Sequence, residues 1–240
     1  PNPSPRAGEG LSTQEPGLKS LLPLWEKGFR DEGKSFVSQS DQEFTWAKVK
    51  QDFALQTVEG NPFIGNIPVV QPTSLLTETL KRNIPWAIAV GNKKARSERI
   101  INPILLEVKD HLHGQVSLFS GEEFNIDPTT GLMGTCDFII SQSPEQLALE
   151  APMLVVVEAK KDDLKQGMGQ CLAEMVAAQR FNAKHERPIL EVYGTVTTGT
   201  VWRFLRLEGN VVTVDLTDYP VPPIERVLRM LVWIAQGSSG

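Results

Sequence analysis

The segment at residues 154–160, with the sequence LVVVEAK, constrains the fold more than any other part of the chain. Its four consecutive apolar residues, three of them β-branched, are typical of a strand that is buried on both faces. Such a strand belongs to a sheet that helices cover on both sides. Glu158 and Lys160 end this strand, and a charge in a core strand is costly unless it is paired or holds a metal ion. The segment therefore predicts a layered fold and also marks a position with unusual chemistry.

Helices and strands are expected to alternate around this strand. Apolar residues at helical spacing predict a helix over residues 92–113, which Pro103 should kink or restart, and a second helix at Leu164–Lys184. This order predicts an α/β fold in which helices flank a mixed β-sheet. The other predicted elements are strands at 116–124, 134–141, 189–197, 201–207 and 211–216, and an amphipathic helix at 223–235.

Composition divides the 240 residues into three parts. Residues 1–20 are rich in Pro, Gly and Ser and predict a flexible arm, whereas residues 92–240 form the main predicted domain. Residues 21–91 lie between them and predict an N-terminal accessory lobe without a chemical motif. Within this lobe we expect a helix from about residue 74 to 83 and a short buried segment at 84–90.

The charge balance argues against a protein that holds nucleic acid by bulk charge. The chain has 24 Lys and Arg against 29 Asp and Glu, a net charge of −5, and such binders are usually basic. An enzyme with an acidic metal pocket and a local basic rim remains compatible. We expect no membrane segment, since the apolar runs are far shorter than the ~18 residues that a span needs. We expect Cys136 and Cys171 to be small buried apolar residues, which fits a reducing, cytoplasmic setting.

Three polar residues of the predicted strands are expected to meet. Side chains alternate along a strand, so Glu158 and Lys160 share a face. If the strand of Asp137 is their neighbour, one register brings the three polar heads together at the sheet end. Two carboxylates provide the hard oxygen ligands of Mg²⁺ or Mn²⁺, and a lysine beside the ion can orient a water molecule. The alternative is a charged strand end that only faces solvent.

Asp137 followed by Glu158-Ala159-Lys160 resembles the signature of the PD-(D/E)xK phosphodiesterase superfamily, whose fold is restriction-endonuclease-like. The EAKK sequence, Gln170 and the sequence VTTGTVW at residues 196–202 are similar to the nuclease domain of type I restriction-enzyme motor subunits and RecB-like nucleases. The resemblance covers about half of the chain. It implies a nuclease that depends on Mg²⁺ or Mn²⁺, with DNA as the expected substrate and RNA as an open alternative.

The resemblance also implies roles for single residues. Asp137 and Glu158 would bind the metal together with the Ala159 carbonyl, and Lys160 would position the attacking water. Gln170 would correspond to the helix glutamine that supports the site.

Other positions depart from the family pattern or leave a choice. The first helix often supplies a glutamate, for which Glu98 is the candidate and Glu107 the second choice. Cys136 stands where the motif has its proline, and Glu174 stands where the helix motif has a tyrosine.

Two further functions remain open from the sequence. The first is a catalytically silent module of the same fold in a defence or repair assembly, which would bind a protein partner. The second is a nucleic-acid binder without catalysis, against which the acidic balance counts. A homodimer would be the simplest way to cut two strands. The sequence contains no Walker-type glycine loop, GxSxG elbow or HExxH helix.

Overall fold

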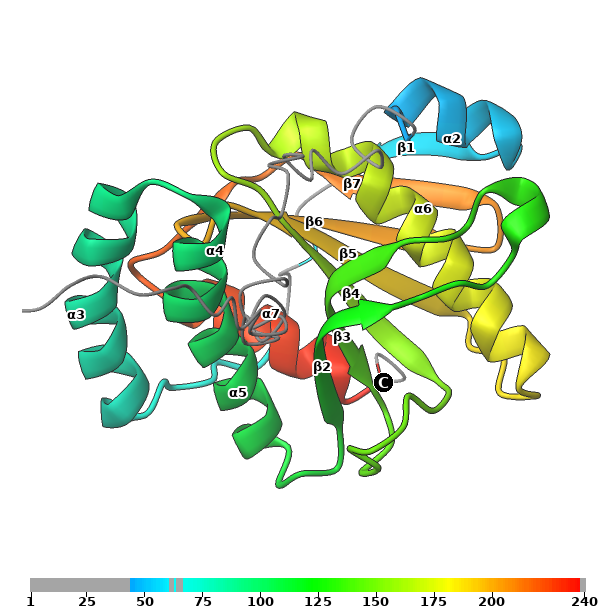
Figure 1. Ribbon diagram of the computed structural model, residues 1–240. Coiled ribbons are helices and arrows are strands. Elements are labelled where there is room, and N and C mark those ends of the chain that lie inside the picture. The colour runs from blue at the N-terminus through cyan, green and yellow to red at the C-terminus, as the bar shows by residue number, and fades with distance from the viewer. Residues whose placement is uncertain (1–43, 61–62, 64–66, 238–240) are drawn as a thin grey trace, which may run out of the picture. The chain divides into compact units, whose positions relative to one another are not determined.

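The structure is a computed structural model that describes residues 44–60, 63 and 67–237. Within these residues the strands form one eight-stranded mixed sheet with helices on both sides, which confirms the predicted α/β class (Figure 1). The strands are β1 (Gln56–Gly60), β2 (Ser117–Glu123), β3 (Thr135–Ser141), β4 (Met153–Ala159), β5 (Glu191–Thr197), β6 (Val201–Glu208), β7 (Val211–Asp215) and β8 (Tyr219–Pro220). The α-helices are α2 (Trp46–Asp52), α3 (Ser74–Val90), α4 (Lys93–Arg96), α5 (Asn102–His111), α6 (Leu164–Lys184) and α7 (Glu225–Ala235).

Strand β4 lies inside the sheet, as its apolar sequence predicts. The strand order is β1-β7-β6-β5-β4-β3-β2, with β8 paired to β6. Every residue of β4 is buried, and the strand pairs antiparallel with β3 and parallel with β5. Because parallel neighbours need a crossover connection, α6 links β4 to β5 across one face of the sheet. This face and the opposite one are each sealed by a hydrophobic cluster.

The two faces have different helical covers (Figure 1). Helix α6 packs on β4 and β5 and contributes its buried side chains, such as Leu172 and Met175, to one cluster. Helices α5 and α7 contribute to the other cluster, for instance through Ile104 and Leu231. A strongly twisted sheet between two helical layers buries both of its faces, which is why β4 carries no exposed side chain.

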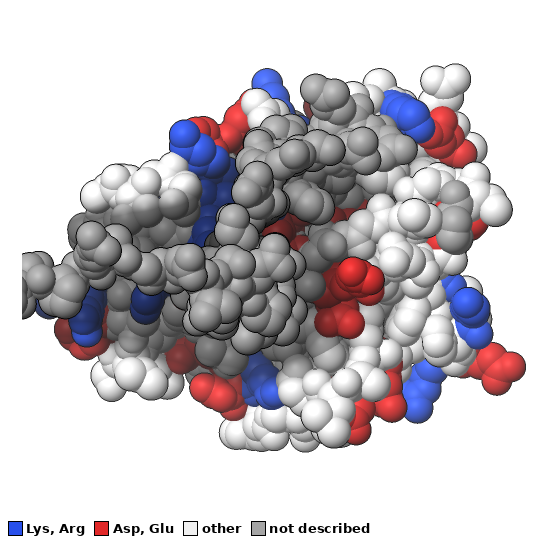
Figure 2. Space-filling model, viewed as in Figure 1, with Lys and Arg blue, Asp and Glu red and all other residues white. Residues whose placement is uncertain are grey.

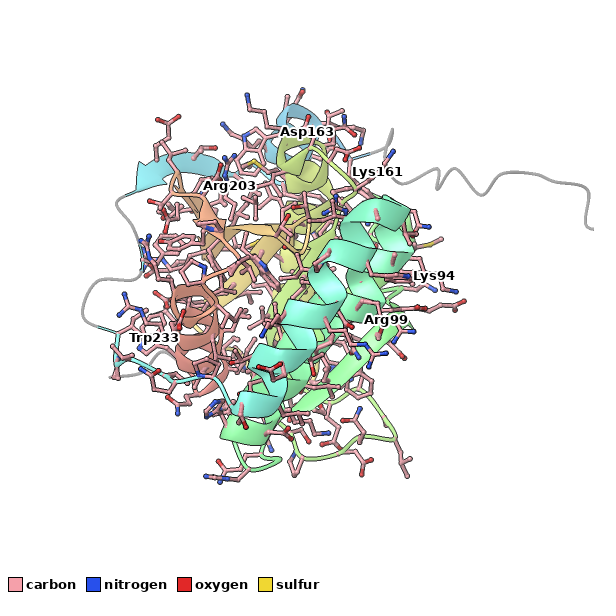
Figure 3. All side chains as sticks on the ribbon, turned by 90° about the vertical axis from the view of Figure 1, so that its left-hand side faces the viewer. Lys94, Arg99, Lys161, Asp163, Arg203 and Trp233 are labelled. Carbon is pink, nitrogen blue, oxygen red and sulfur yellow. The ribbon has the colours of Figure 1, made fainter. Side chains whose placement is uncertain are left out.

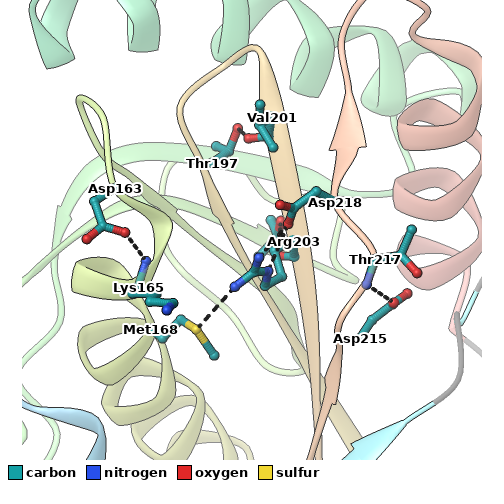
Figure 4. A network of polar contacts seen from close by, with 10 residues as sticks. Asp163, Lys165, Met168, Thr197, Val201, Arg203, Asp215, Thr217 and Asp218 are labelled. Carbon is teal, nitrogen blue, oxygen red and sulfur yellow. Dashed lines mark hydrogen bonds and ion pairs between the residues drawn. The ribbon is translucent and has the colours of Figure 1, made fainter.

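Helix α6 begins and ends as the sequence predicts. Its N-cap is Asp163, whose carboxylate accepts a hydrogen bond from the Lys165 backbone N–H at 2.9 Å (Figure 4). Gly169 allows a close approach, because a Cβ there would lie 2.1 Å from the Phe44 carbonyl oxygen. The same close-up shows Arg203 of β6 holding Asp218 through two hydrogen bonds, of 2.9 and 2.7 Å.

The predicted end of the first helix is wrong. Thr73 caps α3 as expected, but the helix continues through Pro85 to Val90 instead of ending near residue 83. The expected short buried segment at 84–90 is instead the last part of this helix, and most of it is not buried: Trp86 is 51% exposed. A proline within a helix removes one backbone donor, and here the helix tolerates that loss without ending.

The helix predicted over residues 92–113 divides into three pieces. Helix α4 is capped by Asn92, a π-helical segment follows at Ser97–Ile101, and α5 begins at Asn102. Pro103 sits in the first turn of α5, directly after the π-helical segment, so the helical chain continues without one backbone donor at this residue. The chain stays helical on both sides of Pro103 and the Asn102 side chain makes no cap hydrogen bond within the described residues, so the expected restart with Asn102 as cap is wrong.

Residues before position 92 share the sheet with residues after it. Strand β1 pairs parallel with β7, and Leu76 and Leu80 of α3 belong to the same hydrophobic cluster as α5 and α7. The predicted arm at residues 1–20 lies outside the described residues, as do residues 21–43 of the predicted lobe. None of the helices in the described part of the chain is long and apolar enough to cross a membrane.

Candidate active site

Asp137, Glu158 and Lys160 converge at one end of the sheet. The register of β3 and β4 pairs Phe138 with Val157, so that continuing it by one residue places Asp137 opposite Glu158. The Asp137 carboxylate accepts a hydrogen bond from the Ala159 backbone N–H at 2.8 Å, which ties β3 to the end of β4. Lys160 Nζ lies 3.1 Å from Glu158 Oε1. The structure therefore brings together the three side chains that the sequence singles out.

The core of this group is withdrawn from solvent. Glu158 has no exposed surface, Lys160 is 8% exposed, and the Asp137 side chain is 21% exposed. Burial at the end of an internal strand fixes each backbone position. These side chains are therefore held by the sheet and not by mobile loops.

Gln170 and Glu174 extend the group onto α6. Lys160 Nζ donates to Gln170 Oε1 at 3.2 Å, and Gln170 Nε2 donates to Glu174 Oε1 at 3.1 Å. Gly167 makes room for this arrangement, since a Cβ there would lie 3.0 Å from Lys160 Cγ and 2.6 Å from Val196 Cγ1. Gln170 is thus placed against Lys160, and Glu174 lies one helical turn further along α6.

Lys93 of α4 is part of the group, although no motif in the sequence marks it. Its Nζ lies 2.8 Å from Asp137 Oδ2 and 3.8 Å from Glu158 Oε1. A single ammonium group therefore bridges the two carboxylates. Lys93 follows a helix cap and belongs to no motif, so only the fold brings it to the end of β4.

Glu98 is not brought to the group. Its side chain is 55% exposed and lies 3.7 Å from Lys94 Nζ. The π-helical segment turns Ile100 and Ile101 into the core, which leaves Glu98 on the outer side. The second choice, Glu107, is buried, but it accepts hydrogen bonds from the backbone N–H and the hydroxyl of Thr73 at the start of α3. The first helical region thus contributes a lysine to the cluster instead of a glutamate.

The electrostatics show that the group holds too little positive charge for its carboxyl groups. Burial, and next the charge of Asp137, raises the pKa of Glu158 to about 8 in spite of the nearby lysines. Burial also raises the pKa of Glu174 well above its ordinary value, with Glu158 and Asp137 adding to the shift. Burial alone would lower the pKa of Lys93, but the charges of Glu158 and Asp137 outweigh it and raise that pKa. An additional cation would be stabilised here.

The residues present fit a divalent cation. Apart from ion pairs with the two lysines, neither buried oxygen of Glu158 has a hydrogen-bond partner among the described residues. The carboxyl groups of Asp137 and Glu158 and the Ala159 carbonyl are hard oxygen donors. The Lys93 ammonium shows that a positive charge is already bound between the two carboxyl groups. No group of three or more Cys, His, Asp or Glu side chains in the described ranges is arranged for a metal. Water would have to complete the ligand set, as it commonly does for Mg²⁺.

On the faces drawn in Figure 2 and Figure 3, the basic side chains outside this group do not form a broad field. Lys94, Arg99 and Lys161 lie along the same side of the molecule (Figure 3). On the face drawn in Figure 2, the basic and acidic side chains lie in small separate groups. The loop at Thr197-Thr198-Gly199 satisfies its own polar groups, since Thr197 Oγ1 accepts from the Gly199 N–H and donates to the Val201 carbonyl. This loop is therefore explained as a hairpin turn.

Neither any protein-family model nor any curated protein matches the chain. The interpretation of the site therefore depends on the geometry and chemistry of its own residues.

Proposed function

We propose that the protein is a nuclease that uses a divalent metal ion to hydrolyse phosphodiester bonds, with DNA as its substrate. The observation that carries the proposal is the convergence of Asp137, Glu158 and Lys160 at the end of two adjacent strands. The order α5-β2-β3-β4-α6-β5 supports a restriction-endonuclease-like core, because that fold holds its acidic residues and lysine on the second and third strands.

Each residue of the group has a task in this reaction. Asp137, Glu158 and the Ala159 carbonyl would hold Mg²⁺ or Mn²⁺. The ion would lower the pKa of a bound water molecule and neutralise negative charge on the phosphate. Lys160, fixed between Glu158 and Gln170, orients the attacking water and stabilises charge that develops on the phosphate oxygens. The water oxygen bonds to phosphorus as the bond to the 3′ oxygen breaks, leaving a 5′-phosphate and a 3′-hydroxyl.

The proposal is tested by incubating the full chain with plasmid DNA, linear duplex DNA and RNA, each with Mg²⁺, Mn²⁺ or EDTA. We expect metal-dependent cleavage of DNA, and Lys160→Ala should slow it by about 100-fold or more, the usual cost of losing one charge-stabilising group. Lys161→Ala is the matched control, because Lys161 is the next residue but its side chain is 61% exposed and pairs with Asp162. The proposal fails if neither metal supports cleavage, or if Lys160→Ala cuts as fast as the unmodified protein.

A catalytically silent interaction module is the second candidate, and exposed apolar side chains favour it. Helix α3 leaves large apolar residues at the surface, among them Leu75, Trp86 and Ile88. Such residues, when close together, mark surfaces that bind other proteins. This alternative predicts that Mn²⁺ does not bind. Calorimetry separates the two functions, because Mn²⁺ binding that is lost in Asp137→Asn supports the nuclease.

A further inference from the structure

Lys93 occupies the place that a metal ion would need. Its ammonium lies 2.8 Å from Asp137 Oδ2 and 3.8 Å from Glu158 Oε1, the two carboxylates that the proposed nuclease would use for its metal. Magnesium binds carboxylate oxygens at about 2.0–2.1 Å. A divalent cation on Asp137 Oδ2 would lie very close to the Lys93 ammonium, and like charges at short range repel strongly.

The two lysines of the site differ in their freedom to move. The Lys160 side chain is only 10% exposed and is held between Glu158 and Gln170. The Lys93 side chain is 44% exposed and projects from the start of the four-residue helix α4. A long lysine side chain at the surface can turn its charged end into water at little cost. Lys93 can therefore leave the carboxylates while the backbone stays in place.

We propose that Lys93 is a displaceable internal counter-ion, which bridges Asp137 and Glu158 in the metal-free protein and competes with the metal for them. This inference rests on the proposed function. Displaced by the metal, the Lys93 ammonium would turn toward the solvent, to which its side chain is already partly exposed. There it is available to a phosphate group of the substrate.

Competition of this kind links metal binding to nucleic-acid binding. A phosphate that draws Lys93 away from the carboxylates frees them for the metal, so each ligand raises the affinity for the other. The protein would therefore hold its metal weakly until a nucleic acid is bound. This arrangement limits hydrolysis to the complex in which substrate and metal are both present.

The first test measures Mn²⁺ binding to the full chain by calorimetry. Lys93→Met removes the competing charge and should lower the Kd for Mn²⁺ by about 10-fold, whereas Lys94→Met, the neighbouring exposed lysine, should leave it unchanged. Lys93→Arg keeps the charge and should bind Mn²⁺ as weakly as the unmodified protein. The inference is overturned if Lys93→Met binds Mn²⁺ no more tightly than the unmodified protein, or if none of these proteins binds Mn²⁺.

The second test repeats the titration in the presence of a DNA duplex with a cleavage-resistant phosphorothioate backbone. The duplex should lower the Kd for Mn²⁺ several-fold in the unmodified protein and much less in Lys93→Met. An equal gain in both proteins would overturn the proposed coupling. Thermal melting in EDTA checks that Lys93→Met is folded, and Lys93→Gln replaces it if it is not.

These tests separate the inference from the proposed function. Tighter Mn²⁺ binding by Lys93→Met without any DNA cleavage by the unmodified protein would uphold the counter-ion and refute the nuclease. Metal-dependent cleavage together with unchanged Mn²⁺ binding in Lys93→Met would do the reverse.

Discussion

Lys160 is held in place by contacts on two sides. Glu158 lies on the β4 side and Gln170 on the α6 side, while the missing side chain of Gly167 leaves the space through which the lysine passes. A lysine that is buried and paired in this way keeps one orientation. This fixed orientation is what general electrostatic catalysis requires, because the group must be in place before charge develops.

Gly167→Ala should displace Lys160 and lower both activity and stability. Alanine normally favours a helix over glycine, but here its Cβ would meet Val196 at 2.6 Å and the Lys160 stem at 3.0 Å. Overpacking of this kind costs about 1–3 kcal/mol. Urea unfolding measures the loss of stability, and the DNA-cleavage assay measures the loss of activity.

Gly134→Ala serves as the control for this substitution, since nothing lies within 4 Å of a Cβ at that position. If Gly167→Ala proved as stable and as active as Gly134→Ala, the close packing around Lys160 would have no functional meaning.

The reactivity of the two cysteines tests whether the core around them is buried. Burial is the main cause that raises the pKa of Cys136 and Cys171 well above the ordinary thiol value, so both remain protonated at neutral and mildly alkaline pH. We expect the native protein to react with a thiol reagent at least about 100-fold more slowly than the unfolded chain. Rapid modification of either thiol in the native protein would contradict the described packing around α6.

At the scale of elements, the sequence predicts α6 fully and α3 only at its start. Asp163 and a long apolar pattern define α6, which runs from Leu164 to Lys184 as expected. In α3, the sequence predicts a helix that ends near residue 83 and a short buried segment after it, but packing against the residues of the π-helical segment keeps the chain helical to Val90. Local sequence patterns predict an element correctly when its own residues determine its structure. They fail when packing against a neighbouring element determines it.

The edge strand β1 and the position of Lys93 are the other features that the sequence could not supply. Strand β1 has the sequence QTVEG, too short and too polar to indicate a strand, and it forms only because β7 offers it a partner. Asp137, Glu158 and Lys160 were predictable because strand alternation puts polar groups on one face. The position of Lys93 was not predictable, because only the turn between α3 and α4 brings this residue to the carboxylate of Asp137.

Thr73→Ala should destabilise α3 and lower the free energy of unfolding of the protein by about 1–2 kcal/mol, in the range for a lost N-cap. The Thr73 hydroxyl accepts from the Leu76 N–H at 3.2 Å and also donates to the buried Glu107 carboxylate at 2.9 Å. The substitution thus removes a cap and one hydrogen bond to a buried charge. Chemical denaturation measures the change.

Asp163→Ala offers a comparison at another helix start, where the cap binds only the Lys165 N–H in the described residues. Thr73→Ala should be the more costly of the two. An equal or smaller loss for Thr73→Ala would mean that the contact with Glu107 contributes nothing.

For the whole molecule, the excess of buried carboxyl groups predicts how stability depends on pH. In the folded protein Glu158 has a pKa of about 8, against an ordinary value of 4.5. Between these two values the folded state keeps a proton that the unfolded chain has released. The free energy of unfolding of the metal-free protein should therefore fall as the pH rises through this window.

Glu158→Gln removes this titration and should flatten the decline by at least about 1 kcal/mol between pH ~5 and pH ~8. Urea unfolding in EDTA at several pH values measures it. Some decline should remain, because the raised pKa of Glu174 acts in the same direction. Parallel curves for the two proteins would show that Glu158 is ionised in the folded state throughout this range.

The most direct test of the account is a crystal structure of the protein soaked with Mn²⁺, analysed by anomalous scattering. The account predicts one strong anomalous peak in contact with the carboxylates of Asp137 and Glu158, with the Lys93 ammonium moved away from both. A structure with no peak at these carboxylates, and with Lys93 still bridging them, would contradict it.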